Sequence, residues 1–181
     1  MSRFHAFRDE RPKEEYWELV AGTPVLAPRR SIGHQRIRVN LVMALDHCLR
    51  VSHPEWVAVP GMSLLAPDSE IDNPSPDVSV MDAETDGRTI YVPRFYFVAE
   101  VVSPLDDRAV MDAKLKFYQS HASCLGIVLV EEDKISADLY LRGQDWTHRR
   151  LRSPDDQLAI GPIGNLGPLS GLYKNTHLTA T

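Results

Sequence analysis

Cysteine is scarce in this 181-residue chain, and the two present, Cys48 and Cys124, cannot form a disulfide framework. They also do not combine with the histidines in a spacing that is typical of zinc sites. No apolar run approaches the roughly 20 residues of a membrane helix, and residues 1–20 contain no apolar segment of the signal-peptide type. We therefore expect a cytoplasmic protein whose cysteines behave as small hydrophobic residues.

Common nucleotide-binding and hydrolase motifs are also missing. The sequence contains no P-loop, no G-x-S-x-G elbow and no G-x-G-x-x-G fingerprint. Gly161, Gly164 and Gly167 are spaced as G-x-x-G-x-x-G, but they lie in a tail that is rich in glycine and proline and is therefore expected to form a surface loop. The chemistry of this chain must therefore come from other residues.

Charge is unevenly distributed along the chain. The formal net charge of −5 argues against a protein that coats nucleic acid nonspecifically. Residues 68–86 contain seven acids and no Lys or Arg, whereas residues 29–50 contain one acid and five arginines, namely Arg29, Arg30, Arg36, Arg38 and Arg50. The first four arginines of this basic segment are candidates for contacts with nucleic-acid phosphates. The alternative is that both segments are solvated faces that bind nothing.

Hydrophobic periodicity predicts an α/β (α+β) fold with a mixed β-sheet flanked by helices. The length predicts a single domain over residues 1–181. We expect its core at about 14–150, the part that the family resemblance described below covers, and peripheral segments at 1–13 and 161–181. An N-terminal hairpin, a C-terminal antiparallel hairpin and one strand-helix-strand crossover over residues 95–130 are expected. The first predicted helix begins at residues 31–33, with apolar positions at Ile37, Leu41, Leu45 and Leu49, and the second begins at residues 106–107. The predicted strands cover residues 18–20, 25–27, 56–65, 77–81, 95–102, 124–131 and 134–141, and residues 66–76 are predicted to form a loop.

Two charged residues interrupt apolar elements. Glu100 lies in the apolar strand 95–102, where a hydrophobic residue would be less costly. Lys114 lies within about 40° of Val110 on the apolar side of the following helix, because helical residues are about 100° apart. Asp77 begins another short strand, so that two carboxylates and one lysine are candidates for a site at one edge of the sheet. Such carboxylates bind Mg²⁺, although Glu100 and Lys114 could also form only a buried ion pair.

In their order along the chain, these residues resemble a known family. Pro76-Asp77-Val78, Glu100-Val101-Val102-Ser103-Pro104 and the segment from Asp112 to Tyr118 are similar to the Uma-type restriction endonuclease family, within the PD-(D/E)XK nuclease superfamily. The likeness covers about residues 14–150. It implies a restriction-endonuclease-like core and a metal-dependent endonuclease, a hydrolase that cleaves phosphodiester bonds in nucleic acid, with DNA expected.

The resemblance also implies roles for individual residues. Asp77 and Glu100, with the backbone carbonyl of Val101, would bind Mg²⁺ or Mn²⁺, and Lys114 would be the catalytic lysine. The superfamily usually has its lysine at the position of Val102, so in this chain the lysine has moved to the helix. The accessory residues implied by the resemblance are Glu18, His34, Ser103 and Tyr118.

One departure from the family pattern leaves an alternative open. Where the family tends to have Asp-Gly-Glu after Glu18, this chain has Ala21-Gly22-Thr23, which weakens the case for the N-terminal acids. A catalytically silent nuclease-fold protein that acts as a binding module is therefore the alternative function. Cleavage of both strands of a duplex would suit a homodimer.

Overall fold

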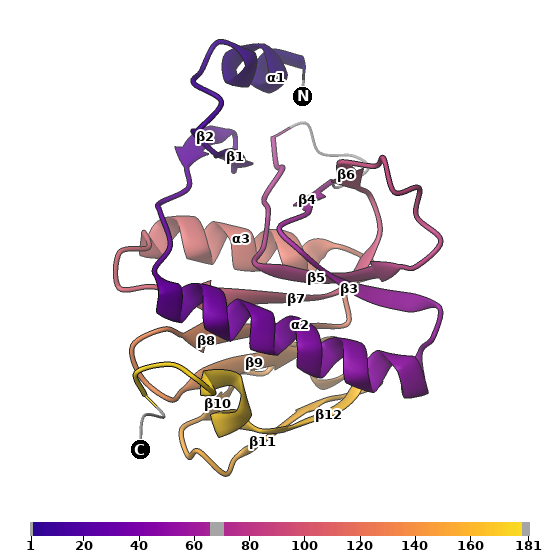
Figure 1. Cartoon of the computed structure of the whole chain (residues 1–181). Helices are drawn as coiled ribbons and strands as arrows, with labels where there is room; N and C mark the ends of the chain where they lie inside the picture. Colours follow the sequence, from indigo (N-terminus) through magenta and orange to yellow (C-terminus); the bar gives the residue numbers. More distant parts are fainter. Residues whose placement is uncertain (1, 66–70, 179–181) are drawn as a thin grey trace.

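A six-stranded mixed sheet forms the centre of the computed structural model, which describes residues 2–65 and 71–178 (Figure 1). Its strands lie in the order β10-β9-β8-β7-β5-β3. They are β3 (Trp56–Pro60), β5 (Val78–Asp82), β7 (Phe95–Val102), β8 (Gly126–Glu131), β9 (Ala137–Leu141) and β10 (Arg149–Leu151). Only β7 and β8 are parallel neighbours in this sheet, and α3 (Arg108–Ser120) connects them. The predicted mixed sheet and crossover are confirmed.

Helices cover both faces of the sheet, with α2 (Ile32–Ser52) in front and α3 behind in the view of Figure 1. α2 begins where the Ser31 side chain accepts a hydrogen bond from the His34 N–H at 3.0 Å. Four of its residues recur every fourth position and are at most 1% exposed, namely Ile37, Leu41, Leu45 and Leu49. This row anchors α2 on the sheet, since each fully buried leucine contributes about 2 kcal/mol.

Smaller elements surround this core. They are α1 (Ser2–Asp9), the hairpin of β1 (Trp17–Val20) and β2 (Thr23–Leu26), the parallel pair β4 (Ser63–Leu64) and β6 (Tyr91–Val92), the turn η1 (Arg142–Gln144), the hairpin of β11 (Gln157–Ile160) and β12 (Gly164–Pro168), and η2 (Leu169–Tyr173). Across residues 2–65 and 71–178, no helix is both long enough and apolar enough to cross a bilayer.

Two expectations from the sequence were wrong. The expected strand 56–65 is divided at Gly61, whose φ of +65° turns the chain between β3 and β4. The tail from residue 161 is not a surface loop, because β12 and η2 pack against α2 and bury Ile163, Leu169 and Leu172 in the core. The loop expected at residues 66–76 lies partly outside the described residues.

The buried tail makes a testable prediction about stability. Leu169 is fully buried, so Leu169→Ala removes packed methyl groups and is expected to lower the free energy of unfolding by about 2–4 kcal/mol. Leu105 is 80% exposed, and Leu105→Ala is expected to change the free energy of unfolding by about 0.5 kcal/mol or less. Chemical denaturation of both variants measures the difference. Equal effects would show that the tail does not belong to the cooperative core.

Candidate active site

Antiparallel pairing of β5 and β7 places two carboxylates opposite each other. Val78 of β5 lies opposite Ala99 of β7, so one further step in this register sets Asp77 opposite Glu100. The Val101 N–H donates a hydrogen bond of 2.8 Å to Asp77 Oδ2 across this gap. Asp77 and Glu100 line one cleft of about 890 Å³. The sheet itself therefore fixes the spacing of the two acids.

A buried lysine reaches the same cleft from α3. Lys114 Nζ lies 2.7 Å from Glu18 Oε2 and 3.3 Å from Glu100 Oε1, so its ammonium bridges two carboxylates. The Tyr118 hydroxyl, one helical turn further along α3, donates a 2.6 Å hydrogen bond to Glu100 Oε1. Lys114, Glu18 and Glu100 are each at most 6% exposed. Lys114, which the sequence places on the apolar stripe of this helix, thus meets two anions in the interior.

Glu18 is brought to the site by the N-terminal hairpin. An isolated bridge between Leu19 and Asn73 holds β1 against the segment that precedes Asp77. The Ser75 N–H of that segment donates to Glu18 Oε2 at 3.0 Å, the same oxygen that contacts Lys114. This bridge joins residues that are far apart in the sequence, and no local signal indicated it.

Asp77 is held from several directions. His34 Nε2, fully buried at the start of α2, lies 3.3 Å from Asp77 Oδ2, although the contact is not aligned as a hydrogen bond. The main-chain carbonyl of Asp77 accepts from Arg38 Nε at 3.0 Å and from the Gly61 N–H at 3.1 Å. A Cβ atom at Gly61 would lie 2.8 Å from Arg38 Nη2, so glycine leaves room for this guanidinium.

Burial and charge act differently on the two acids. Burial raises the pKa of Glu100 to about 7, with the negative charges of Asp77 and Glu18 adding to this rise and Lys114 opposing it. Burial acts in the same direction on the pKa of Asp77, but contacts with His34, the Val101 N–H and Arg30 outweigh it and lower this pKa. Near neutral pH, Asp77 is therefore ionised while Glu100 can carry a proton.

The lysine stays charged in this environment. Burial favours the neutral amine, but the carboxylates of Glu100 and Glu18 outweigh it and raise the pKa of Lys114. A permanently protonated ammonium can stabilise negative charge and orient a water molecule, but it cannot accept a proton. The arrangement therefore favours an electrostatic role for Lys114 over a role as general base.

The oxygen atoms of the cleft fit a hard divalent cation. The contacts of Asp77 described above use Oδ2 and those of Glu100 use Oε1, which leaves Oδ1 and Oε2 for a ligand. The N–H and C=O of one strand residue point the same way, so the Val101 carbonyl lies on the edge of β7 that carries Asp77. Within the described chain, no three Asp, Glu, His or Cys side chains are grouped to hold a metal ion. A cation would thus need two carboxylates, one carbonyl and water, a set typical of Mg²⁺.

The other predicted site residues are divided between the cleft and its surroundings. Arg29, Arg30 and Arg38 line the cleft, and Arg30 also forms a 2.6 Å ion pair with Asp106. Arg36 lies outside it, on another face of α2, where it donates to the Asn175 carbonyl.

Of the accessory residues, His34 contacts Asp77 and Tyr118 contacts Glu100, as described above. Ser103 does not line the cleft. Its N–H donates to Asp106 Oδ2, and its hydroxyl accepts from the Leu105 N–H, in the turn before α3.

Comparison with known proteins places the chain among nuclease-like proteins. A family model described as "Uma2: Putative restriction endonuclease" matches residues 1–165. A solved structure described as "a putative nuclease belonging to DUF820", from Anabaena variabilis, matches with a TM-score of 0.76. The match has 15% sequence identity and covers 92% of this chain and 94% of that chain, which shows a shared fold. No curated protein matches the chain.

The raised pKa of Glu100 predicts how stability depends on pH. Because the pKa rises from an ordinary value of 4.5 to about 7 on folding, the contribution of Glu100 is complete below pH 4.5 and is lost as pH rises through 7. This loss amounts to roughly 3 kcal/mol. The amide of the Glu100→Gln variant does not titrate, so the stability of this variant is expected to fall less than that of the wild type over this range.

Urea denaturation between about pH 4.5 and 8 measures this difference. Glu84→Gln, at an exposed position, is the matched control and is expected to follow the wild type. Parallel curves for the wild type and Glu100→Gln would contradict the account of Glu100.

Proposed function

This chain belongs to the Uma2 restriction endonuclease family, and we propose that it is a metal-dependent endonuclease that hydrolyses phosphodiester bonds in DNA at the cleft of Asp77, Glu100 and Lys114. The observation that carries this proposal is the meeting of two facing carboxylates and a buried ammonium in one cleft. An ordinary buried ion pair needs only one carboxylate for each lysine. Here Lys114 meets both Glu18 and Glu100, and Asp77 adds a third acid directly opposite Glu100.

Asp77 Oδ1, Glu100 Oε2 and the Val101 carbonyl would hold Mg²⁺ or Mn²⁺. When bound, such an ion supplies positive charge to the phosphate and lowers the pKa of a water molecule. Glu100 must lose its proton before it can act as a ligand, and the neighbouring Lys114 ammonium favours its ionised form. His34 and the Val101 N–H keep Asp77 in one orientation.

Lys114 acts electrostatically in the proposed mechanism. Its ammonium carries a charge beside the acids, where it can stabilise the negative charge that develops on the phosphate oxygens during hydrolysis. Tyr118 keeps the Glu100 carboxyl in place through its 2.6 Å hydrogen bond. Glu18 holds Lys114 from the other side, so the ammonium stays in position while Glu100 changes its protonation.

Arginines at the rim of the cleft would receive the DNA backbone. Arg29 is exposed, and together with Arg30 and Arg38 it provides positive charge beside an acidic centre that would otherwise repel phosphates. A two-fold dimer would present two such clefts, one for each strand of a duplex.

One observation favours the alternative function, a catalytically silent binding module. Lys114 already satisfies both Glu18 and Glu100 in the absence of a cation, as a purely structural ion-pair network would. The two functions differ in what substitutions do to activity and to stability.

A plasmid-nicking assay with Mg²⁺ or Mn²⁺, combined with thermal melts, separates the two functions. For an endonuclease, the wild type nicks the plasmid, while Glu100→Gln and Lys114→Met remain folded and are slower by about 10² or more. For a silent module, the wild type is inactive, and Lys114→Met costs about 3–5 kcal/mol because it leaves the buried carboxylates of Glu18 and Glu100 without their cation. In that case the triple variant Glu18→Gln/Glu100→Gln/Lys114→Met, which removes all three charges, recovers much of the loss. An inactive wild type with this recovery would overturn the proposal.

The rim arginines predict a salt dependence of DNA binding. If Arg29 neutralises one phosphate, Arg29→Ala is expected to weaken binding and to reduce the slope of log K against log salt by about one. Arg88 is highly exposed and lies outside the cleft, so Arg88→Ala is the matched control. Binding to a duplex is measured by fluorescence anisotropy over a range of salt concentrations. Equal slopes for the wild type and Arg29→Ala would exclude this contact.

A further inference from the structure

The solvent-facing side of α2 carries an unusual row of residues. The row recurs at alternating steps of four and three positions, and its members are Ile32, Arg36, Val39, Met43, Asp46 and Arg50. At about 100° per residue these positions fall on one narrow side of the helix, opposite the core-facing row that contains Leu41 and Leu45. We call this surface the outer row of α2.

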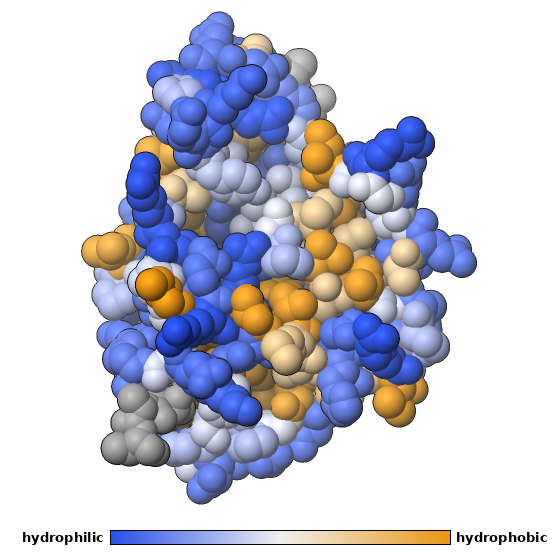
Figure 2. All heavy atoms as spheres, viewed as in Figure 1, coloured by the Kyte–Doolittle hydropathy of each residue, from blue (hydrophilic) through white to orange (hydrophobic). Residues whose placement is uncertain are grey.

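The apolar members of the outer row are exposed. Ile32 is 74% exposed, Val39 54% and Met43 65%. Figure 2 shows apolar side chains over α2 in the middle of the visible face. A spacing of this kind is the pattern by which one helix packs against another, and within the described residues no other α-helix packs extensively against α2.

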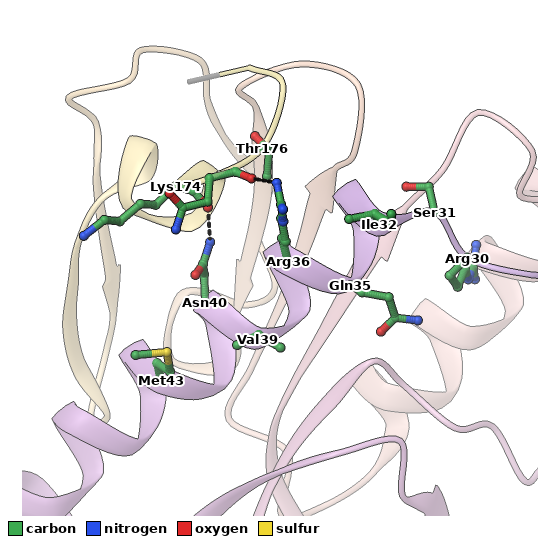
Figure 3. A pocket seen from close by; sticks show the side chains of 11 residues that line it. Arg30, Ser31, Ile32, Gln35, Arg36, Val39, Asn40, Met43, Lys174 and Thr176 are labelled. Carbon is green, nitrogen blue, oxygen red and sulfur yellow. Dashed lines mark hydrogen bonds between the residues drawn. The ribbon is translucent and has the colours of Figure 1, made fainter. Parts of the chain in front are cut away.

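The groove beside the outer row is partly closed by the C-terminal segment. Arg36 donates to the Asn175 carbonyl, and the Asn40 side chain donates to the Lys174 carbonyl (Figure 3). The Asn40 side chain also donates to the Leu172 carbonyl. These bonds fix the segment along one flank of α2. Val39 and Met43 line the same hollow, of about 850 Å³, and remain exposed within it.

We propose that the outer row of α2 is a docking surface for a second copy of this chain, with the two α2 helices antiparallel about a two-fold axis at the level of Leu41. In this alignment Val39 lies opposite Met43 of the second copy, and Arg36 lies opposite its Asp46. The two-fold axis repeats each pair, so two apolar contacts are flanked by two pairs of opposite charge.

Charge complementarity selects this partner over others. Asp46, next to Met43 in the row, would repel the phosphates of a nucleic acid, but it attracts Arg36 of an antiparallel copy. At the ends of the row, Ile32 lies opposite Arg50, whose aliphatic stem can cover it. A parallel alignment would instead place each charged residue against its own copy, with like charges facing.

The charged groups are able to form these pairs. Asp46 accepts from Arg50 through Oδ2, an exposed pair on the same helix, which leaves Oδ1 for another donor. Arg36 donates to Asn175 through Nη1 and has further N–H groups on its guanidinium. The docking surface is the interface of the dimer that the proposed function calls for, and in this it rests on the proposed function. The contacts of the outer row themselves do not depend on nuclease activity. The test of the docking surface measures mass, so failure of the dimer and failure of the nuclease can be told apart.

Sedimentation equilibrium of the full chain over a range from about 1 to 500 μM tests the docking surface. The wild type is expected to shift from monomer to dimer within this range. Val39→Lys places an ammonium in the apolar centre and is expected to raise the dimer dissociation constant by about tenfold or more. Val51→Lys, on the same helix but off the outer row, is the matched control and should leave the constant unchanged. Circular dichroism checks that each variant is folded.

Charge reversal tests the alignment itself. Arg36→Asp or Asp46→Arg alone would place like charges opposite each other and is expected to weaken the dimer by about tenfold. The double variant Arg36→Asp/Asp46→Arg restores opposite charges and should return to within about threefold of the wild type.

Three results would overturn the proposal. The first is a wild type that stays monomeric over the whole range. The second is a dimer that Val39→Lys leaves unchanged, since it would use another surface. The third is a double variant no stronger than its single variants. If the chain is monomeric and Val39→Lys instead changes duplex affinity, the outer row contacts nucleic acid and not a second copy.

Discussion

One ammonium buried between two carboxylates is the interaction on which the candidate site depends. Lys114 comes from α3, Glu100 from the centre of the sheet and Glu18 from the N-terminal hairpin, so this contact joins three parts that are distant in the sequence. Removing a charge from water is costly, and each of the three groups is tolerated because the others compensate it. The same cost makes the cleft responsive to any added cation or anion, because few water molecules screen the charges there.

The helix α2 connects this site to the rest of the molecule. Its core-facing row fixes it on the sheet, and its first turns bring His34 and Arg38 to Asp77. Its solvent-facing row lies on the opposite side and is the surface that we propose docks a second copy. A single regular helix can pack on the sheet, hold Asp77 and present a docking surface, because its 3.6-residue repeat places these residues on different faces. A substitution on one face therefore leaves the residues of the other two in place.

Sequence patterns predicted the parts of the fold and site that have local signals. Glu100 and Lys114 were identifiable because a charge inside an apolar strand or stripe is rare, and the periodicity of α2 gave its buried row directly. Non-local contacts could not be predicted in this way. The bridge of Leu19 to Asn73, which brings Glu18 to Lys114, depends on how the loop before Asp77 folds back. The buried tail was missed because its glycines and prolines indicated a loop, while tertiary packing of Leu169 and Leu172 on α2 outweighed that local preference.

Calorimetric titration of Mn²⁺ into the folded protein tests the central claim, that Asp77 and Glu100 form a cation site beside Lys114, most directly. The account predicts one site in the wild type that is lost in Asp77→Asn, which keeps the shape of the side chain and removes its charge. The site is expected to persist in Lys114→Met, because the ammonium is not a ligand. A folded wild type that binds no Mn²⁺, or an Asp77→Asn variant that binds it as well as the wild type, would contradict the account.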